Sequence, residues 1–131
     1  MSRLQLDGIE PSMLMRLDKE LCTEHDVWLL VEVKPYGASL FMSVLRVEHV
    51  LVIGRDPVCG LVLEGELVSR RHALLYATET GLEVEDISRH GTLVNGLPLH
   101  AKRVQVENEI QLMIGCNGVR LRRLGTQKGT I

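Results

Sequence analysis

Cationic and hydroxyl side chains gather in three short stretches near the middle of the sequence. The polar residues that stand out are Arg55, Ser69, Arg70, Arg71, Arg89 and His90. Between residues 54 and 96 the sequence holds four arginines and seven acidic residues, and all four arginines lie in these stretches. Guanidinium groups bind phosphate oxygens through paired hydrogen bonds, and hydroxyl groups and loop backbone N–H groups donate to the same oxygens. Cations concentrated in this way in an acidic region predict a focused anion site.

Metal binding and catalysis are the other chemistries that these residue types could support. The five histidines, at positions 25, 49, 72, 90 and 100, include no pair with the close spacing of a metal site. Ser69 and His72 could suggest a hydrolase, but no nucleophile elbow surrounds the serine, and the arginines suit an anion ligand better. We therefore expect no metal, no cofactor and no enzymatic activity.

The composition is typical of one ordinary domain with some extra sequence at an end. The chain has 131 residues, a formal net charge of -2 and 45% hydrophobic residues, of which only four are aromatic, so its core must be mainly aliphatic. A net charge near zero argues against a general nucleic-acid binder. Cys22, Cys59 and Cys116 indicate free thiols rather than disulfides or a metal knuckle. With no membrane-length apolar run and no signal peptide, we expect a soluble, cytoplasmic protein.

Short β-rich runs separated by turn residues fill the sequence from residue 27 onward. The pair Asn95-Gly96 is the strongest hairpin signal, because both residue types tolerate positive φ. Many short strands at this spacing favour an all-β sandwich, in which loops gather at the two ends and commonly carry function. The pattern predicts eleven strands, at residues 27–33, 39–45, 49–53, 60–63, 73–78, 82–86, 92–94, 97–99, 103–106, 109–114 and 119–124.

The first 25 residues differ from the rest of the chain. Ser12 is suited to cap a helix in which Met13, Leu14, Leu17 and Leu21 recur at helical spacing. A helix of about three turns is marginal alone in water, so it must pack on the domain, pair with another chain or fray. We therefore divide the chain into a helical or extended N-terminal segment at residues 1–25, a β-sandwich at 26–124 and a flexible tail at 125–131.

Three short motifs occur in a fixed order within the β-rich region. They are Gly54-Arg55, Ser69 with His72 three positions later, and Asn95-Gly96. Each motif alone is a weak signal, but together, at these spacings, they resemble the signature of the forkhead-associated (FHA) domain family. The resemblance covers residues 27–124, nearly all of the chain beyond the N-terminal segment. It implies an eleven-stranded β-sandwich whose loops at one end bind phosphothreonine peptides.

The resemblance assigns contacts with a phosphopeptide to several loop positions. It implies that Arg55 grips the phosphate and that Ser69 donates its hydroxyl hydrogen to a phosphate oxygen. Arg70, at a position where the family varies, would add a charged contact. Arg89 stands where many members have a threonine-like residue whose backbone contacts phosphate. His90 departs from the asparagine that usually holds the peptide main chain, and this departure leaves the role of position 90 open.

Four further residues are implied to support the loops rather than to touch the peptide. Gly54 would allow close packing behind the site, and His72 would brace the loops through hydrogen bonds. Asn95, together with Gly96, would shape the loop that faces the peptide. These roles are expectations that follow from the resemblance.

Plainer roles fit some of the same residues. Arg55 could be an exposed cation at a strand end, and Ser69 could be a turn residue bonded to its own backbone. The resemblance favours a phosphothreonine-dependent interaction module that binds a phosphorylated protein, such as a Ser/Thr kinase or its substrate. The alternative is an FHA-like β-sandwich without phosphate binding that acts as a structural or oligomerisation domain. The presence of His90 keeps this alternative open.

The N-terminal segment contains a candidate phosphorylation site. Thr23 is followed three positions later by Asp26. FHA domains often select the residue at that position, and some recognise a threonine in their own flanking tail. Phosphorylated Thr23 is therefore a candidate ligand within one chain, or between two chains that self-associate through this segment. An unmodified linker threonine is the plainer interpretation.

Overall fold

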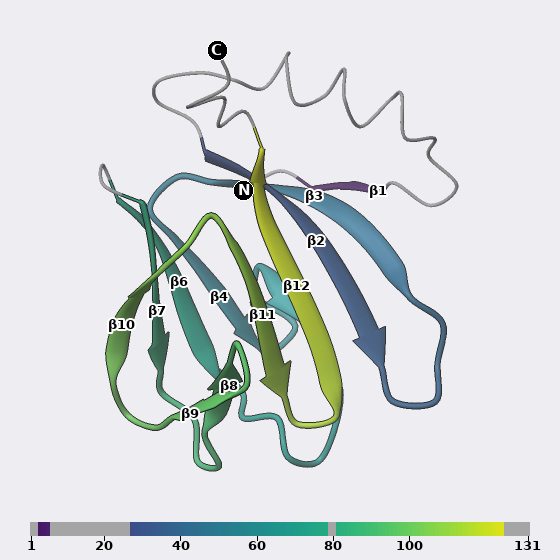
Figure 1. Cartoon of the computed structure of the whole chain (residues 1–131). Coiled ribbons are helices and arrows are strands. Elements are labelled where there is room, and N and C mark those ends of the chain that lie inside the picture. The colour runs from purple at the N-terminus through teal and green to yellow at the C-terminus, as the bar shows by residue number, and fades with distance from the viewer. Residues whose placement is uncertain (1–2, 6–26, 79–80, 125–131) are drawn as a thin grey trace.

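The computed structural model describes residues 3–5, 27–78 and 81–124 of the chain. These residues form two β-sheets packed face to face, and none of them lies in a helix (Figure 1). The strands are β1 (Arg3–Gln5), β2 (Val27–Pro35), β3 (Phe41–Val47), β4 (Val50–Gly54), β5 (Leu61–Val62), β6 (Ala73–Thr78), β7 (Gly81–Asp86), β8 (Thr92–Val94), β9 (Leu97–Leu99), β10 (Arg103–Val106), β11 (Glu109–Ile114) and β12 (Asn117–Leu124). The predicted all-β sandwich is confirmed. Its eleven predicted strands correspond to β2–β12, and β1 is an additional strand.

The order of the strands brings distant parts of the sequence together. One sheet has the order β1-β3-β2-β12-β11-β8-β9, and the other has the order β10-β7-β6-β4-β5. The pairs are antiparallel except for β4 and β5, where Gly54 lies opposite Val62. The chain leaves β4 and returns to run parallel beside it, so residues 55–60 form a tight loop at the end of this sheet.

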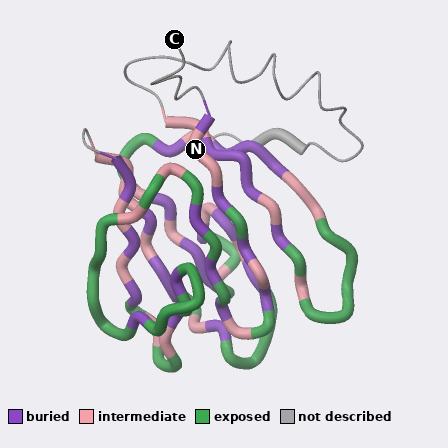
Figure 2. The backbone as a smooth tube through the Cα atoms, viewed as in Figure 1, coloured by how far each residue is buried: buried purple, intermediate pink, exposed green. Residues whose placement is uncertain are grey.

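Aliphatic side chains from the two inner faces form the core between the sheets. Strand β11 shows the pattern, because Ile110, Leu112 and Ile114 are buried while the residues between them are exposed. Figure 2 shows the same contrast between buried inner strands and exposed turns. Each fully buried aliphatic side chain contributes about 1.5–3 kcal/mol to folding. This core gives the loops at the ends of the sandwich a rigid support.

A few boundaries differ from those that the sequence pattern indicated. The strand predicted at residues 39–45 is β3, which begins at Phe41, because the turn after β2 extends through the half-exposed Leu40. Strand β12 begins at Asn117 because this residue pairs with both Pro35 and Ile114. The predicted helix after Ser12 and the predicted tail at 125–131 lie outside the described residues.

Candidate functional site

The loop after β4 and the loop before β6 lie side by side at one end of the sandwich. The backbone N–H of Arg55 donates to the carbonyl oxygen of Ser69 at 3.0 Å, and that of Asp56 donates to Arg70 at 3.0 Å. The Arg55 side chain donates its Nε–H to the carbonyl oxygen of Val68, also at 3.0 Å. Arg55, Ser69 and Arg70 therefore share one rim, where both arginines are exposed and the serine is half-buried.

Gly54 and Cys59 hold this rim from behind through the carbonyl group of Arg70. A β-carbon added at Gly54 would lie 2.2 Å from the Arg70 carbonyl oxygen, so no larger residue fits without a shift of backbone. The buried Cys59 thiol donates to the same oxygen at 3.2 Å. Burial raises the pKa of this thiol, which keeps it protonated and able to donate. The carbonyl group of Arg70 is thus held by three neighbours, which are Gly54, the backbone N–H of Asp56 and the thiol of Cys59.

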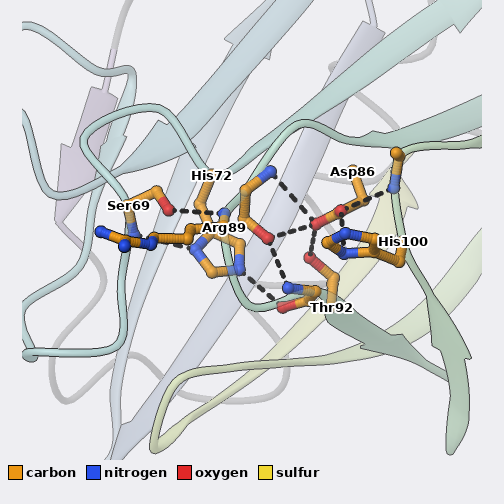
Figure 3. Close-up of polar contacts among 9 residues, drawn as sticks. Ser69, His72, Asp86, Arg89, Thr92 and His100 are labelled. Atoms are coloured by element: carbon orange, nitrogen blue, oxygen red, sulfur yellow. Dashed lines mark hydrogen bonds and ion pairs between the residues drawn. The ribbon is translucent and has the colours of Figure 1, made fainter.

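His72 is fully buried and joins the loop before β6 to the loop before β8 (Figure 3). Its Nδ1 accepts a hydrogen bond from the backbone N–H of Ser69 at 3.0 Å, and its Nε2 lies 2.9 Å from the carbonyl oxygen of Gly91. Because Nδ1 accepts, Nε2 must carry the hydrogen and donate to Gly91. Burial lowers the pKa of His72, which favours this neutral form.

The hydroxyl group of Ser69 makes a second connection between the same two loops. The backbone N–H of Arg89 donates to the Ser69 Oγ at 3.0 Å (Figure 3). The backbone N–H at position 89, to which the family resemblance assigns a phosphate contact, is therefore engaged with Ser69. Arg89 and His90 are both exposed at the same end of the sandwich. The two loops that carry Ser69 and Arg89 form one continuous surface beside Arg55.

Asp86 organises the loop before β8 and was not among the residues selected from the sequence. Its buried carboxylate accepts hydrogen bonds at Oδ1 from the hydroxyl groups of Ser88, at 2.6 Å, and Thr92, at 2.8 Å. Oδ2 accepts from the backbone N–H of Ala101 at 2.9 Å and lies 3.5 Å from His100 Nδ1. The Ser88 Oγ in turn accepts from the N–H of Gly91 at 2.7 Å.

These contacts outweigh the cost of burying the Asp86 carboxylate. Burial alone would raise the pKa of Asp86, but the hydrogen bonds from Ser88, Ala101 and Thr92 lower it below its ordinary value. An ionised carboxylate therefore fixes the loop that carries Arg89 and His90. The sequence did hold a signal for this role: an aspartate two residues before a serine, at the end of a strand, is typical of a side-chain-stabilised turn.

Asn95 and Gly96 form the two-residue turn between β8 and β9. Their φ angles are 50° and 83°, which are the positive values that this hairpin turn requires. The Asn95 side-chain oxygen accepts a hydrogen bond from the backbone N–H of Gln111 at 2.9 Å, and the backbone N–H of Asn95 donates to the Gln111 carbonyl oxygen at 2.7 Å. The Asn95 carboxamide oxygen thus fixes the hairpin to β11.

Three further features concern possible metal ligands, cysteines and membrane-spanning helices in the described part of the chain. Within residues 3–5, 27–78 and 81–124, no cluster of three histidine, cysteine, aspartate or glutamate side chains is placed to hold a metal ion. Of the cysteines in these ranges, Cys59 is buried and Cys116 is exposed, and both are free thiols. In the same ranges, no helix has the length and apolarity needed to cross a membrane. Thr23 lies outside the described residues.

The sequence comparisons identify the family. A model of the FHA domain matches residues 51–117, slightly more than half of the chain. The match includes all three loops of the candidate site. The chain therefore belongs to the FHA domain family, a family of interaction modules known for phosphothreonine-dependent binding.

Two curated relatives share part of the sequence. The chain is 42% identical over 60 residues to the oxoglutarate dehydrogenase inhibitor of Corynebacterium glutamicum, which covers 45% of this chain and 42% of that protein. It is 30% identical over 82 residues to the probable serine/threonine-protein kinase fhkA of Dictyostelium discoideum, which covers 56% of this chain and 14% of that protein. The chain thus spans less than half the length of each relative.

Solved structures share the fold. The FHA domain of the CT664 protein from Chlamydia trachomatis has a TM-score of 0.61 and 22% identity, over 72% of this chain and 96% of that chain. The N-terminal FHA domain of Rad53p from S. cerevisiae, in complex with a phosphothreonine peptide, has a TM-score of 0.61 and 18% identity, over 71% of this chain and 92% of that chain. These similarities establish the β-sandwich architecture.

Proposed function

We propose that this chain is a phosphothreonine-dependent interaction module, and that the phosphate binds between Arg55, the Ser69–Arg70 pair and the Arg89–His90 pair. The observation that carries the proposal is the hydrogen bond from the Arg89 N–H to the Ser69 hydroxyl. It joins two loops, separated by about twenty residues in sequence, into one cationic rim beside Arg55.

The contacts expected at this rim are strong enough to support specific binding. Arg55 and Arg70 would donate charge-assisted hydrogen bonds, each contributing about 1.5–3 kcal/mol. Because the Ser69 Oγ accepts from Arg89, the Ser69 hydroxyl hydrogen can point away from the protein and donate to a phosphate oxygen. Micromolar binding requires about 8 kcal/mol. Three contacts of this kind would account for most of that free energy.

Arg89 and His90 would act at the outer part of the rim. Both side chains are exposed, and the backbone that carries them is fixed by Asp86 and Ser88. The Arg89 guanidinium can reach a phosphate without the loss of its backbone contact with Ser69. His90 would replace the usual asparagine as a donor to the peptide main chain, with one ring N–H when neutral and two when protonated.

The partner that we propose is a phosphorylated protein in a Ser/Thr kinase pathway, either the kinase or a substrate. Support comes from the partial likeness to a probable serine/threonine-protein kinase and from the shared fold with a domain that is solved with a phosphothreonine peptide. On this proposal the chain acts in the cytoplasm, without enzymatic activity of its own. The β-sandwich at residues 26–124 would be the binding unit, with residues 1–25 as an extension that can contribute phosphorylated Thr23.

A titration with an oriented phosphothreonine peptide library tests this function. We expect wild-type protein to bind a subset of phosphothreonine peptides, with phosphoserine versions at least about tenfold weaker, because one methyl group contributes about 1–3 kcal/mol. Arg55→Ala should weaken binding by about 2–4 kcal/mol. Arg120→Ala is the matched control, since this exposed arginine of β12 forms a side-chain ion pair with Glu109 of β11 and lies outside the candidate site. Equal binding by wild type and Arg55→Ala would contradict the proposal.

The alternative function is that of a structural or oligomerisation domain without phosphate binding. The replacement of the family's usual asparagine by His90 is the observation that favours it. In that case no phosphothreonine peptide would bind, and the chain would self-associate in a way that Arg55→Ala leaves unchanged.

A further inference from the structure

Exposed apolar side chains are concentrated on one side of the candidate site. Nine large apolar side chains are exposed among the described residues, and five of them lie on the strands and loops next to the Arg89–His90 loop. These five, which together with Pro98 we call the apolar track, are Leu67, Leu93, Leu97, Val104 and Met113. Single exposed apolar residues are common on protein surfaces, but a contiguous group marks an interaction site.

The first part of the apolar track lies on the outer face of the larger sheet. Met113 on β11 lies opposite Leu93 on β8, and Leu93 lies opposite Pro98 on β9. These three side chains form a row across three neighbouring strands. A hollow of about 300 Å³ follows this row, and Leu67 and His90 also line it. The row therefore begins at the loops of the proposed phosphate site.

The second part of the apolar track continues around the edge of the sandwich. A groove of about 590 Å³ separates β9 from β10, which are the last strands of their sheets, and Leu97 and Val104 line it. Pro98 and Leu99 line both this groove and the hollow beside His90. The two depressions are thus parts of one surface that passes over β9.

The edge of β10 adds hydrogen-bonding groups to this surface. The N–H of Asp86 donates to the carbonyl of Lys102, so alternate residues of β10 direct their backbone groups toward β7. The N–H and C=O groups of Arg103 and Gln105 therefore point away from β7, at an edge that no described strand covers. Figure 2 shows this strand as largely exposed. Such an edge can pair with an extended segment.

We propose that the apolar track binds a second, apolar segment of the same partner that provides the phosphothreonine. The inference rests on the proposed function, because the hollow beside His90 and the groove beside Val104 share Pro98 and Leu99. An extended chain advances about 3.3 Å per residue, and β8 and β9 are three residues long. A segment within about ten residues of the phosphothreonine therefore reaches the whole track. The partner is thus recognised in two places, at a phosphate and at an apolar segment several residues away.

A degenerate peptide library tests this inference on the full chain. The probe is a set of 21-residue peptides with a central phosphothreonine and randomised flanks. We expect wild-type protein to enrich apolar residues more than four positions from the phosphothreonine, and Leu97→Glu to lose only this distant enrichment. Leu97 is 71% exposed, so the substitution should not affect folding. Leu40→Glu is the matched control, because Leu40 is 50% exposed and lies outside the track.

Affinities of one selected peptide complete the test. Leu97→Glu should weaken the binding of the 21-residue peptide about tenfold, because it removes one buried leucine contact. A seven-residue version around the phosphothreonine should bind wild type and variant equally. Equal affinity for the long peptide, or no distant enrichment, would overturn the inference while leaving the proposed function intact.

Two more results would count against the inference, one at the phosphate site and one at the track. If Arg55→Ala enriches the same peptides as wild type, the proposed function fails and the inference fails with it. If Leu97→Glu leaves peptide affinity unchanged and instead dissociates a dimer in sedimentation velocity, a second copy of the chain covers the track. That result would also overturn the inference.

Discussion

Gly54 lies directly beneath the carbonyl group of Arg70, at a distance that leaves no room for a side chain. Gly54 ends β4, whereas Arg70 belongs to the loop before β6, so this approach sets how closely the two loops pack. Two hydrogen bonds, from the N–H groups of Arg55 and Asp56, depend on the same spacing. The position of the Arg70 side chain at the rim is thus decided by a residue that cannot touch a ligand.

Gly54→Ala is predicted to destabilise the protein and to weaken phosphopeptide binding. The added methyl group would meet backbone atoms, which cannot rotate away, and overpacking of this kind costs about 1–3 kcal/mol. Urea unfolding at equilibrium measures the free energy of unfolding. Gly118→Ala is the control, because a β-carbon there has only the carbonyl oxygen of Lys34 near it, at 3.8 Å. Equal stability of the two variants would show that the loop after β4 and the loop before β6 can move apart to admit the methyl group at no cost in stability.

His72 is predicted to make the protein less stable as the pH falls below its ordinary pKa of 6.5. The pKa of His72 is lowered in the folded state, so below pH 6.5 the unfolded chain binds a proton that the folded chain does not. The contribution of His72 to the free energy of unfolding should therefore be constant above this pH and then decrease, by at most about 1.4 kcal/mol per pH unit. Unfolding in urea at pH 7.5, 6.5 and 5.5 measures this slope.

Two variants separate His72 from the other histidines. His49→Gln changes an exposed histidine and should keep the slope between pH 6.5 and 5.5. His72→Asn should be less stable at pH 7.5, because it loses a bond to Ser69 or Gly91, and its slope should be smaller. A slope that His72→Asn leaves unchanged would assign the effect to another group.

Asp86→Asn is predicted to cost about 2–4 kcal/mol of stability, because at least one of the buried donors at Ser88, Thr92 and Ala101 would lose its acceptor. Peptide affinity should fall as well, since the loop that carries Arg89 would lose its anchor. In the wild type, the lowered pKa means that the stability contributed by this carboxylate is present above pH 3.8 and is lost below it. Chemical denaturation at pH 7 measures the cost.

The control for Asp86 is a carboxylate in a surface ion pair. Glu83 pairs with Arg103 at 2.5 Å on the outer face of the smaller sheet. Glu83→Gln should cost less than about 1 kcal/mol, as is usual for exposed pairs. Similar losses of stability for the two substitutions would mean that the buried hydrogen bonds of Asp86 contribute little to the free energy of unfolding.

His90→Asn is predicted to strengthen phosphopeptide binding by about 0.5–1.5 kcal/mol, the usual contribution of one hydrogen bond. The variant restores the carboxamide that the family usually has at this position, and a carboxamide both donates to and accepts from a peptide main chain. Fluorescence anisotropy at one fixed pH measures the affinities of the wild type and the variant. Equal affinities would place His90 away from the ligand.

The sequence was sufficient to predict the fold, and it indicated the loops that form the candidate site. Alternating and aliphatic runs between turn residues placed all eleven strands from β2 to β12, since each strand must bury one face. The three motifs also indicated loops that lie close together in space. These loops meet because β4 ends, and β6 and β8 begin, at the same end of the sandwich. The pattern of Arg3–Gln5 did not predict β1, because three residues are too few for a periodicity to be visible.

The internal connections of the site could not be predicted in the same way. The local turn between Asp86 and Ser88 was visible in the sequence, but the further donors at Thr92 and Ala101 are brought close to Asp86 only by the fold. The engagement of the Arg89 N–H by Ser69 likewise depends on how two loops pack. Spacing in the sequence indicates which residue types are present in a loop, but the partner of each backbone group is decided by tertiary contacts.

The proposed binding surface and its supporting frame use different parts of the chain. Gly54, His72 and Asp86 hold the loops from inside through contacts with loop backbone and hydroxyl groups, whereas Arg70 and His90 face solvent. On the proposed function, changes at the exposed positions should alter which peptide is bound without unfolding the domain. A designer who wishes to redirect this protein to a new target can vary the outer residues as a set and leave the inner three untouched.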